Sequence, residues 1–332
     1  MAFMSRRFRN FLLRLLVTAA LVAFLVGKVD IGDVLTRLRR VDLRYAGAAA
    51  ALLLLQLVLS GARWQLVARL LAVPLALQPA IRLALIGQFF SQALPSAIGG
   101  DAVRAWLVSR GNIGFGRALV TVVCDRAIGL VMLLAIACVT LPLFFERVTA
   151  AAPRHALAVL YAALWSGFLL LLWAGPRLLQ PFMRFKVTAG LYMIVEGLRT
   201  LVRPRGHAAT VLVLALVIQS AVIAGVYWLA QALGVAVRLG DCFAIVPPVM
   251  LAAMVPLSIA GWGVREGAMV AGFGLLGVPA ADALAVSLLF GITQLALALP
   301  GGALWLRSGA TAPQAVDAWS GQGIDDQAAR PR

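Results

Sequence analysis

The sequence predicts an all-α protein that crosses a membrane several times, and three observations support this prediction. Of the 332 residues, 62% are hydrophobic and only 13% are charged, an imbalance that a water-soluble domain of this length could not hide from solvent. Several apolar runs approach or exceed the roughly 20 residues that a helix needs to cross about 30 Å of hydrocarbon. A motif interrupted by proline and glycine occurs once in each half of the chain. Together these features are typical of a polytopic helical transporter.

Charge and cysteine content narrow the function classes. The formal net charge of +16 would indicate nucleic-acid binding in a soluble protein. Here the arginines cluster between apolar runs, as the positive-inside rule describes for cytoplasmic loops, so nucleic acid is not an expected partner. Cys124, Cys138 and Cys242 show no paired spacing, and His155 and His207 stand alone. The sequence therefore predicts no disulfide framework and no metal site, and no motif calls for a cofactor.

Six apolar runs are long enough to be membrane spans. The first follows Arg6, Arg7 and Arg9 and lacks a well-placed signal-peptidase site at its end, so we interpret it as an uncleaved anchor. The expected spans are residues 11–27, 45–62, 118–143, 157–175, 209–230 and 284–306.

Four shorter apolar pieces flank the two copies of the motif. Residues 81–94 and 101–109 flank the first copy, and residues 242–256 and 264–277 flank the second. Each piece is too short to span the membrane comfortably at 1.5 Å per residue. We therefore expect each pair to form a re-entrant helical hairpin.

The distribution of basic residues predicts a cytoplasmic membrane protein with both termini in the cytoplasm. The loop after the first span is an exception, because its arginines would face outward, although Asp30, Asp33 and Asp42 partly offset them. We interpret residues 31–43 as an interfacial amphipathic helix. The residues expected on the cytoplasmic side are Arg6, Arg7, Arg9, Arg14, Arg63, Arg69, Arg82, Arg177, Arg184, Lys186, Arg199, Arg203, Arg205 and Arg307.

The repeated motif reads Pro95-x-x-Ile98-x-Gly100-x-x-Val103-Arg104 and Pro256-x-x-Ile259-x-Gly261-x-x-Val264-Arg265, with five identities at the same spacing. In the expected topology, repeat unit 45–143 runs in the opposite sense to repeat unit 209–306. The first hairpin would enter from the cytoplasm and the second from outside, as alternating access requires. Residues 1–308 are expected to form one transmembrane domain, and residues 309–332 a disordered tail.

Four charged residues that follow the helix breaks are the main candidates for substrate binding: Asp101, Arg104, Arg265 and Glu266. Charged side chains at membrane depth cost about 2.5 to 3.5 kcal/mol on insertion scales, so they need a reason to be there. Free backbone N–H groups at a helix start attract anions, and an arginine offers a phosphate two parallel donors. We expect Arg104 and Arg265 to bind phosphate, and the two carboxylates to orient them or engage a cationic headgroup.

Other residues near the motifs leave two interpretations open. Asp125 and Arg126 form either a structural or coupling ion pair or part of the binding site. Gln88 and Gln92 recur with Ser91 on one helix face, as the lining of a groove or as interhelical hydrogen-bonding groups. Four glycines permit tight turns with positive φ and would also let a lipid phosphate approach the backbone. These glycines are Gly99, Gly100, Gly261 and Gly263.

Four stretches carry a resemblance to a known family: Arg63-Trp64, residues 87–104, residues 125–130 and residues 258–267. In this order they resemble the family named after the transmembrane region of lysylphosphatidylglycerol synthase. The resemblance implies a flippase-like membrane protein that handles aminoacylated phospholipids or is linked to polyprenyl-phosphate sugar or hopanoid pathways. The soluble aminoacyl-transfer domain of lysyl-lipid synthases is not expected, because the chain ends shortly after its last span.

The sequence contains no motif that indicates catalysis. The sequence has no His-Glu-x-x-His, no Gly-x-Ser-x-Gly and no phosphate-binding loop with lysine, so no catalytic residue is assigned. The predicted function is a flippase that moves a phospholipid or another lipid-linked headgroup across the cytoplasmic membrane. Two alternatives remain. One is a non-transporting scaffold whose partner is a glycosyltransferase or a lipid-modifying enzyme, and the other is a membrane-embedded enzyme with Asp101 or Asp125 as general base.

Overall fold

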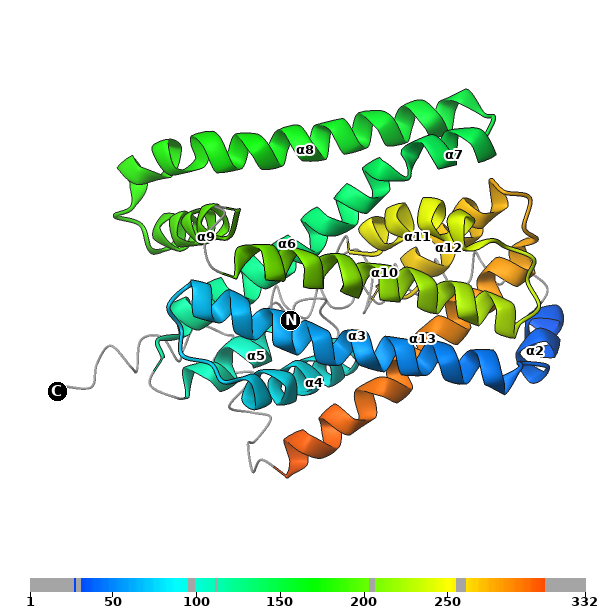
Figure 1. Cartoon of the computed structure of the whole chain (residues 1–332), viewed down its shortest axis with the longest axis horizontal. Helices are drawn as coiled ribbons and strands as arrows, with labels where there is room; N and C mark the ends of the chain where they lie inside the picture. The colour runs from blue at the N-terminus through cyan, green and yellow to red at the C-terminus, as the bar shows by residue number, and fades with distance from the viewer. Residues whose placement is uncertain are drawn as a thin grey trace, which may run out of the picture.

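The computed structural model describes residue 27 and residues 31–94, 99–110, 113–202, 207–254 and 261–307. Throughout these residues the regular structure is helical and contains no strand, which confirms the predicted all-α membrane fold (Figure 1). Residues 11–26 of the first expected span and the tail at 309–332 lie outside the described residues.

Five helices among the described residues are long and apolar enough to cross a membrane, and they confirm the other five expected spans. The helix that contains the expected span 45–62 is longer than predicted. The apolar run ends before Arg63, but the helix continues to Leu70. The five helices are α3 (Leu43–Leu70), α6 (Phe115–Val139), α8 (Ala151–Leu179, continued by the 3-10 turn η1, Gln180–Phe182), α10 (Ala208–Ala232) and α13 (Ala280–Leu306).

The apolar pieces around the motifs form two helical hairpins. The first consists of α4 (Leu77–Ala93) and α5 (Gly99–Ser109), and the second of α11 (Leu239–Ala253) and α12 (Val264–Gly274). In each hairpin the two helices pack against each other. The tips, which include Pro95 and residues 255–260, lie outside the described residues.

The helices α3 and α10 form an antiparallel pair between the two halves of the molecule (Figure 1). The backbone N–H of Asp42, which caps the start of α3, donates to the carbonyl of Ala232 at the end of α10 at 2.8 Å. At the same end, the rings of Tyr45 and Trp228 stack with their centroids 5.6 Å apart. Because each hairpin follows the C-terminal end of its long helix, the two hairpins enter the bundle from opposite ends.

The packing of one half matches that of the other. In the first half α3 contacts α4, α4 contacts α5, and α5 contacts α6; in the second half α10 contacts α11, α11 contacts α12, and α12 contacts α13. Across the halves, α4 packs on α13 as α11 packs on α6. This arrangement agrees with the predicted inverted repeat.

Four further helices surround this core: α2 (Ile31–Arg39), α7 (Leu141–Arg147), α8 and α9 (Lys186–Val202). The predicted amphipathic helix exists as α2, whose Val34 packs against Leu284 and Ala285 of α13. Its position at a membrane interface stays a prediction. The segment between the expected spans 157–175 and 209–230 holds Arg184, Lys186 and Arg199, and it contains α9, which packs against α6 and α8.

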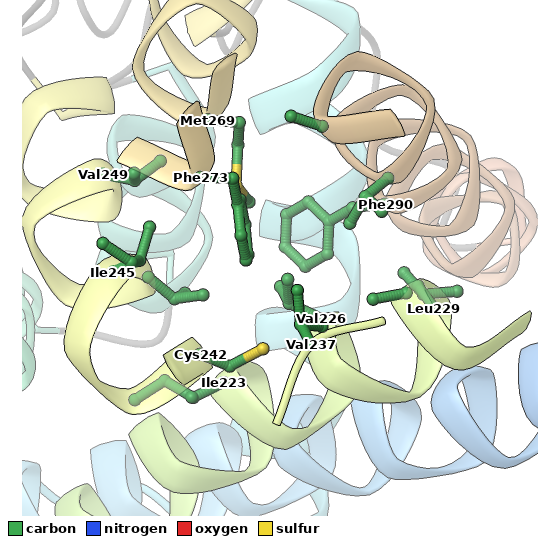
Figure 2. Close-up of a cluster of buried hydrophobic side chains, with 14 of the residues drawn as sticks. Ile223, Val226, Leu229, Val237, Cys242, Ile245, Val249, Met269, Phe273 and Phe290 are labelled. Atoms are coloured by element: carbon green, nitrogen blue, oxygen red, sulfur yellow. The ribbon is translucent and has the colours of Figure 1, made fainter. Parts of the chain in front are cut away.

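The largest apolar core lies in the second half of the molecule. Figure 2 shows side chains from α10, α11, α12 and α13 converging there, with Phe273 and Phe290 at the centre. Met269 and Ile245 are fully buried beside them. Dispersion and hydrophobic burial therefore hold the second hairpin in place. The first hairpin also has an apolar cluster, around Ile86, Phe90, Val103 and Trp106, and ion pairs connect it to α6 in addition.

Candidate functional site

Five charged side chains from α3, α5 and α6 form one ion-pair network in the first half. Arg63 Nε donates to Asp125 Oδ1 at 2.8 Å, and Arg63 Nη2 donates to the Asp125 backbone carbonyl at 3.2 Å. Arg104 bridges two carboxylates, with Nη1 3.3 Å from Asp101 Oδ1 and Nη2 3.5 Å from Asp125 Oδ2. Arg126 Nε donates to Asp101 Oδ2 at 2.8 Å. All of these residues except Arg126 are less than 9% exposed.

Glycines bring the first hairpin close enough to build this network. A Cβ at Gly100 would overlap the carbonyl oxygen of Gly87 and the hydroxyl of Ser91, and a Cβ at Gly87 would overlap the Arg104 side chain. The first turn of α5 therefore packs directly on α4. Gly99 is buried against Leu94 and, like Gly100, has no positive φ. At these two positions close packing, rather than a left-handed turn, requires glycine.

Arg104 also lies against an aromatic ring. Its guanidinium carbon is 4.1 Å from the centroid of Trp64, which is fully buried and donates from Nε1 to Thr121 Oγ1 at 3.1 Å. A guanidinium over an indole face gains cation–π attraction, which is stronger when both groups are desolvated. Trp64 thus fixes the plane of the Arg104 guanidinium.

The second hairpin carries a smaller charge cluster. Arg265 Nε donates to Glu266 Oε1 at 3.0 Å, and the backbone N–H of Gly263 donates to Glu266 Oε2 at 2.6 Å. The guanidinium lies 4.9 Å from the Trp262 ring centroid and 5.5 Å from that of Phe290. Arg265 and Glu266 are both buried.

The second motif copy does contain the predicted left-handed turns. Gly261 and Gly263 have φ of +78° and +87°, a region that favours glycine because it has no Cβ. Gly263 is the N-cap of α12, so its conformation places the first turn of that helix, and with it Glu266. The predicted positive φ of these two glycines is confirmed, and their contact with a lipid phosphate stays a prediction.

The two halves differ at one corresponding position. Arg104 contacts Asp125 of α6, whereas Arg265 contacts Ser287 of α13, with 3.3 Å between Arg265 Nε and Ser287 Oγ. Among the ion pairs of the described residues, Arg265 has only Glu266, which belongs to its own helix. Ion pairs therefore connect the first hairpin to α6, whereas the second hairpin meets α13 through apolar side chains and the neutral hydroxyl of Ser287.

Two adjoining central cavities of about 190 and 300 Å³ lie between the halves. The smaller contacts Arg104 and Gln88, and the larger contacts Gly261 and Arg265. The two cavities share six lining residues, which come from α3, α6, α10 and α13. These shared residues are Gln56, Ser60, Arg63, Arg126, Val222 and Gln294. The central cavities thus extend from one motif copy to the other.

Positive charge predominates around the central cavities. Four arginines line them, and the carboxylates that pair with these arginines number three, which leaves one excess positive charge. Two guanidinium nitrogens, Arg63 Nη1 and Arg104 Nε, are buried without a hydrogen-bond partner among the described residues. A buried unsatisfied donor costs about 1 to 3 kcal/mol, and more when it is charged. The excess positive charge and the guanidinium donors therefore favour binding of an anion.

Six of the twelve predicted site residues line the central cavities: Gln88, Arg104, Asp125, Arg126, Gly261 and Arg265. Neither cavity is lined by Asp101, Glu266, Gly99, Gly100 or Gly263. Arg126 lines both cavities and pairs with Asp101 of α5. Asp125 pairs with Arg63 of α3 and Arg104 of α5. The ion pairs of Asp125 and Arg126 are therefore made to other helices and not to each other. Gln88 lines the smaller cavity. Gln92 is half-buried and lines neither.

Arg63 was the main residue that the sequence reasoning misplaced. We expected it in a cytoplasmic loop, and this was wrong, because it lies inside α3 and is 4% exposed. Helical spacing offered a signal that was not used: Gln56, Ser60 and Arg63 follow one another at i, i+4 and i+7, on one face of a helix. Gln219 and Gln294, isolated in apolar spans, were likewise missed although both line the larger cavity.

Among the described residues, no group of three His, Cys, Asp or Glu side chains could hold a metal ion.

Comparison with protein families gives a match. The model described as the lysylphosphatidylglycerol synthase TM region matches residues 11–302. No curated protein and no solved structure matches the chain.

Proposed function

This chain belongs to the family of the lysylphosphatidylglycerol synthase TM region, and we propose that it is a flippase that moves a phosphate-bearing lipid headgroup across the cytoplasmic membrane. One observation carries the proposal: the arginine-lined central cavities lie between the two motif copies and contact Arg104 at one end and Arg265 at the other. In transporters built from inverted repeats, the substrate site lies at the interface of the repeats near the middle of the bilayer.

The chemistry of the central cavities suits a phosphate. Guanidinium groups form charge-assisted hydrogen bonds to phosphate oxygens, frequently two in parallel. Arg63 and Arg104 each keep one buried nitrogen that no described residue satisfies, and both line the smaller cavity. The two guanidinium groups would attract a headgroup phosphate into the smaller cavity, while the acyl chains stay in the surrounding lipid.

The carboxylates serve as positioning groups in this proposal. Asp101 accepts from both Arg104 and Arg126, and Glu266 accepts from Arg265 and from the backbone of Gly263. Each guanidinium is therefore held in one orientation before a ligand arrives, which reduces the entropy lost on binding. The carboxylate oxygens are occupied by guanidinium donors, which argues against a role as general base, and we propose no covalent chemistry.

The test is the rate at which a labelled phospholipid changes leaflet in proteoliposomes, normalised to folded protein. Arg104→Lys and Arg265→Lys keep the charge but remove the planar fork, so each should slow transport, and the Gln variants should slow it further. Arg199→Lys is the matched control, because Arg199 lies on α9, half-exposed and paired with Glu196, away from the central cavities.

A structural role for these arginines would lower the unfolding temperature but leave the transport rate per folded molecule unchanged. Parental rates in both Gln variants would overturn the phosphate-binding proposal and favour the scaffold alternative. Chemical turnover of the lipid by purified protein would favour the enzyme alternative.

A further inference from the structure

A separate cavity of about 600 Å³ lies between α4, α5 and the C-terminal end of α13, and we call it the outer cavity. Four apolar side chains line it, Pro79, Leu83, Ile86 and Leu107, of which Ile86 is 1% exposed. Polar groups come from opposite sides: Gln78 and Arg82 from α4, and Arg307 from the C-cap of α13. The outer cavity is therefore amphipathic.

The polar groups of the outer cavity carry positive charge without a balancing acid. Among the described residues that line it there are two arginines and no carboxylate. Arg82 Nη2 makes one long contact, 3.5 Å to the carbonyl oxygen of Leu304, and both arginines are exposed. Arginines at the ends of membrane helices bury their aliphatic stems and keep the guanidinium at the headgroup level. Arg307 directly follows the last residue of the spanning helix α13, so we expect its guanidinium at this level.

The outer cavity is distinct from the central cavities. Arg82, Leu83 and Ile86 line the outer cavity, whereas Ala84 and Gln88 of the same helix line the smaller central cavity. These two sets of residues lie on different faces of α4. The helix α4 therefore separates the two cavities, and the outer one plays no part in the phosphate binding proposed above.

We infer that the outer cavity is a binding site for an anionic phospholipid, with its headgroup phosphate between Arg82 and Arg307 and an acyl chain along Leu83, Ile86 and Leu107. Charge complementarity favours this occupant, since basic pockets between membrane helices attract anionic headgroups. The apolar wall favours a lipid over a soluble anion, because burying it against an acyl chain is favourable. A zwitterionic lipid would bring a cationic group next to two arginines and bind less well.

The experiment measures lipid retained by the full-length protein in native mass spectrometry, after exposure to mixed phosphatidylglycerol and phosphatidylcholine. The parental protein should retain phosphatidylglycerol preferentially. Arg82→Gln with Arg307→Gln should reduce this retention by at least about tenfold, because it removes both charged hydrogen-bond donors that would hold the phosphate. The double variant Arg39→Gln with Arg40→Gln removes the same charge from exposed positions at the end of α2 and should not reduce it.

Three results would overturn the inference. The first is equal retention of both lipids by the parental protein. The second is unchanged retention in the Arg82 and Arg307 double variant while its unfolding temperature matches the parent. The third is displacement of the lipid by millimolar inorganic phosphate, which would identify a site for a soluble anion. Arg82 and Arg307 line only the outer cavity, so the double variant tests this site separately from lipid in the central cavities and from the transport proposal.

Discussion

Arg63 and Asp125 are 62 positions apart in the sequence and meet as a buried ion pair, with 2.8 Å between Arg63 Nε and Asp125 Oδ1. The side chains are 5% and 1% exposed. Asp125 also accepts from Arg104, so a single carboxylate connects the long helix α3, the hairpin helix α5 and α6. The stability of the first half therefore depends strongly on this residue.

Asp125→Asn should destabilise the protein by about 3 to 5 kcal/mol. It keeps the side-chain shape but leaves the buried Arg63 without its counter-charge and removes one of the two carboxylates that pair with Arg104. Thermal unfolding in detergent, followed by size-exclusion chromatography, measures the loss. Glu196→Gln removes the half-exposed pair with Arg199 on α9 and is the matched control, with an expected effect of about 0 to 1 kcal/mol. Equal effects of the two substitutions would contradict the assigned role of Asp125.

Ser287→Ala should have a much smaller effect than Asp125→Asn, although Ser287 occupies the corresponding place beside Arg265. The substitution removes contacts of 3.3 Å to Arg265 Nε and to Glu266 Oε1, but it leaves the Arg265–Glu266 pair intact. A typical hydrogen bond contributes about 1 kcal/mol net. The same unfolding assay checks this, and a loss as large as that of Asp125→Asn would show that the two halves are anchored alike.

Gly100→Ala should lower both the unfolding temperature and the yield of folded protein. The added methyl group would overlap the Gly87 carbonyl oxygen and the Ser91 hydroxyl, and so force α5 away from α4. Gly267→Ala is the matched control in the other hairpin, because nothing lies within 4 Å of the added Cβ. There the higher helix propensity of alanine should be neutral or stabilising, by up to about 1 kcal/mol. Similar destabilisation by both substitutions would exclude close packing as the reason for Gly100.

Single-cysteine labelling should show the open ends of the two hairpins on opposite sides of the membrane. In a background without Cys124, Cys138 and Cys242, a membrane-impermeant maleimide should reach Arg110→Cys from the cytoplasm and Arg238→Cys from outside. Both positions are exposed, Arg110 just beyond α5 and Arg238 at the start of α11. Labelling of the two cysteines from the same side would disprove the inverted topology.

Much of the fold follows from local features of the sequence. The lengths of the apolar runs predicted five helices that the structure describes, and the short pieces around the motifs predicted both hairpins. These predictions succeed because a membrane forces every backbone polar group into a helix and sets the length of that helix. The end of α3 was predicted wrongly, because a hydropathy argument ends the helix before Arg63 while α3 continues to Leu70.

The candidate site likewise combines features that the sequence predicts with features that only the tertiary structure produces. The sequence by itself determined the repeated motif and the charged residues that follow each break, because spacing is a local property. It predicted positive φ at four glycines, of which Gly261 and Gly263 have it while Gly99 and Gly100 do not. Only the tertiary structure decided that Arg63 neutralises Asp125, that Gly100 is a packing contact, and that Ser287 stands where the other half has a carboxylate. Ion pairs and cavities depend on how distant helices approach one another, and no local pattern specifies that approach.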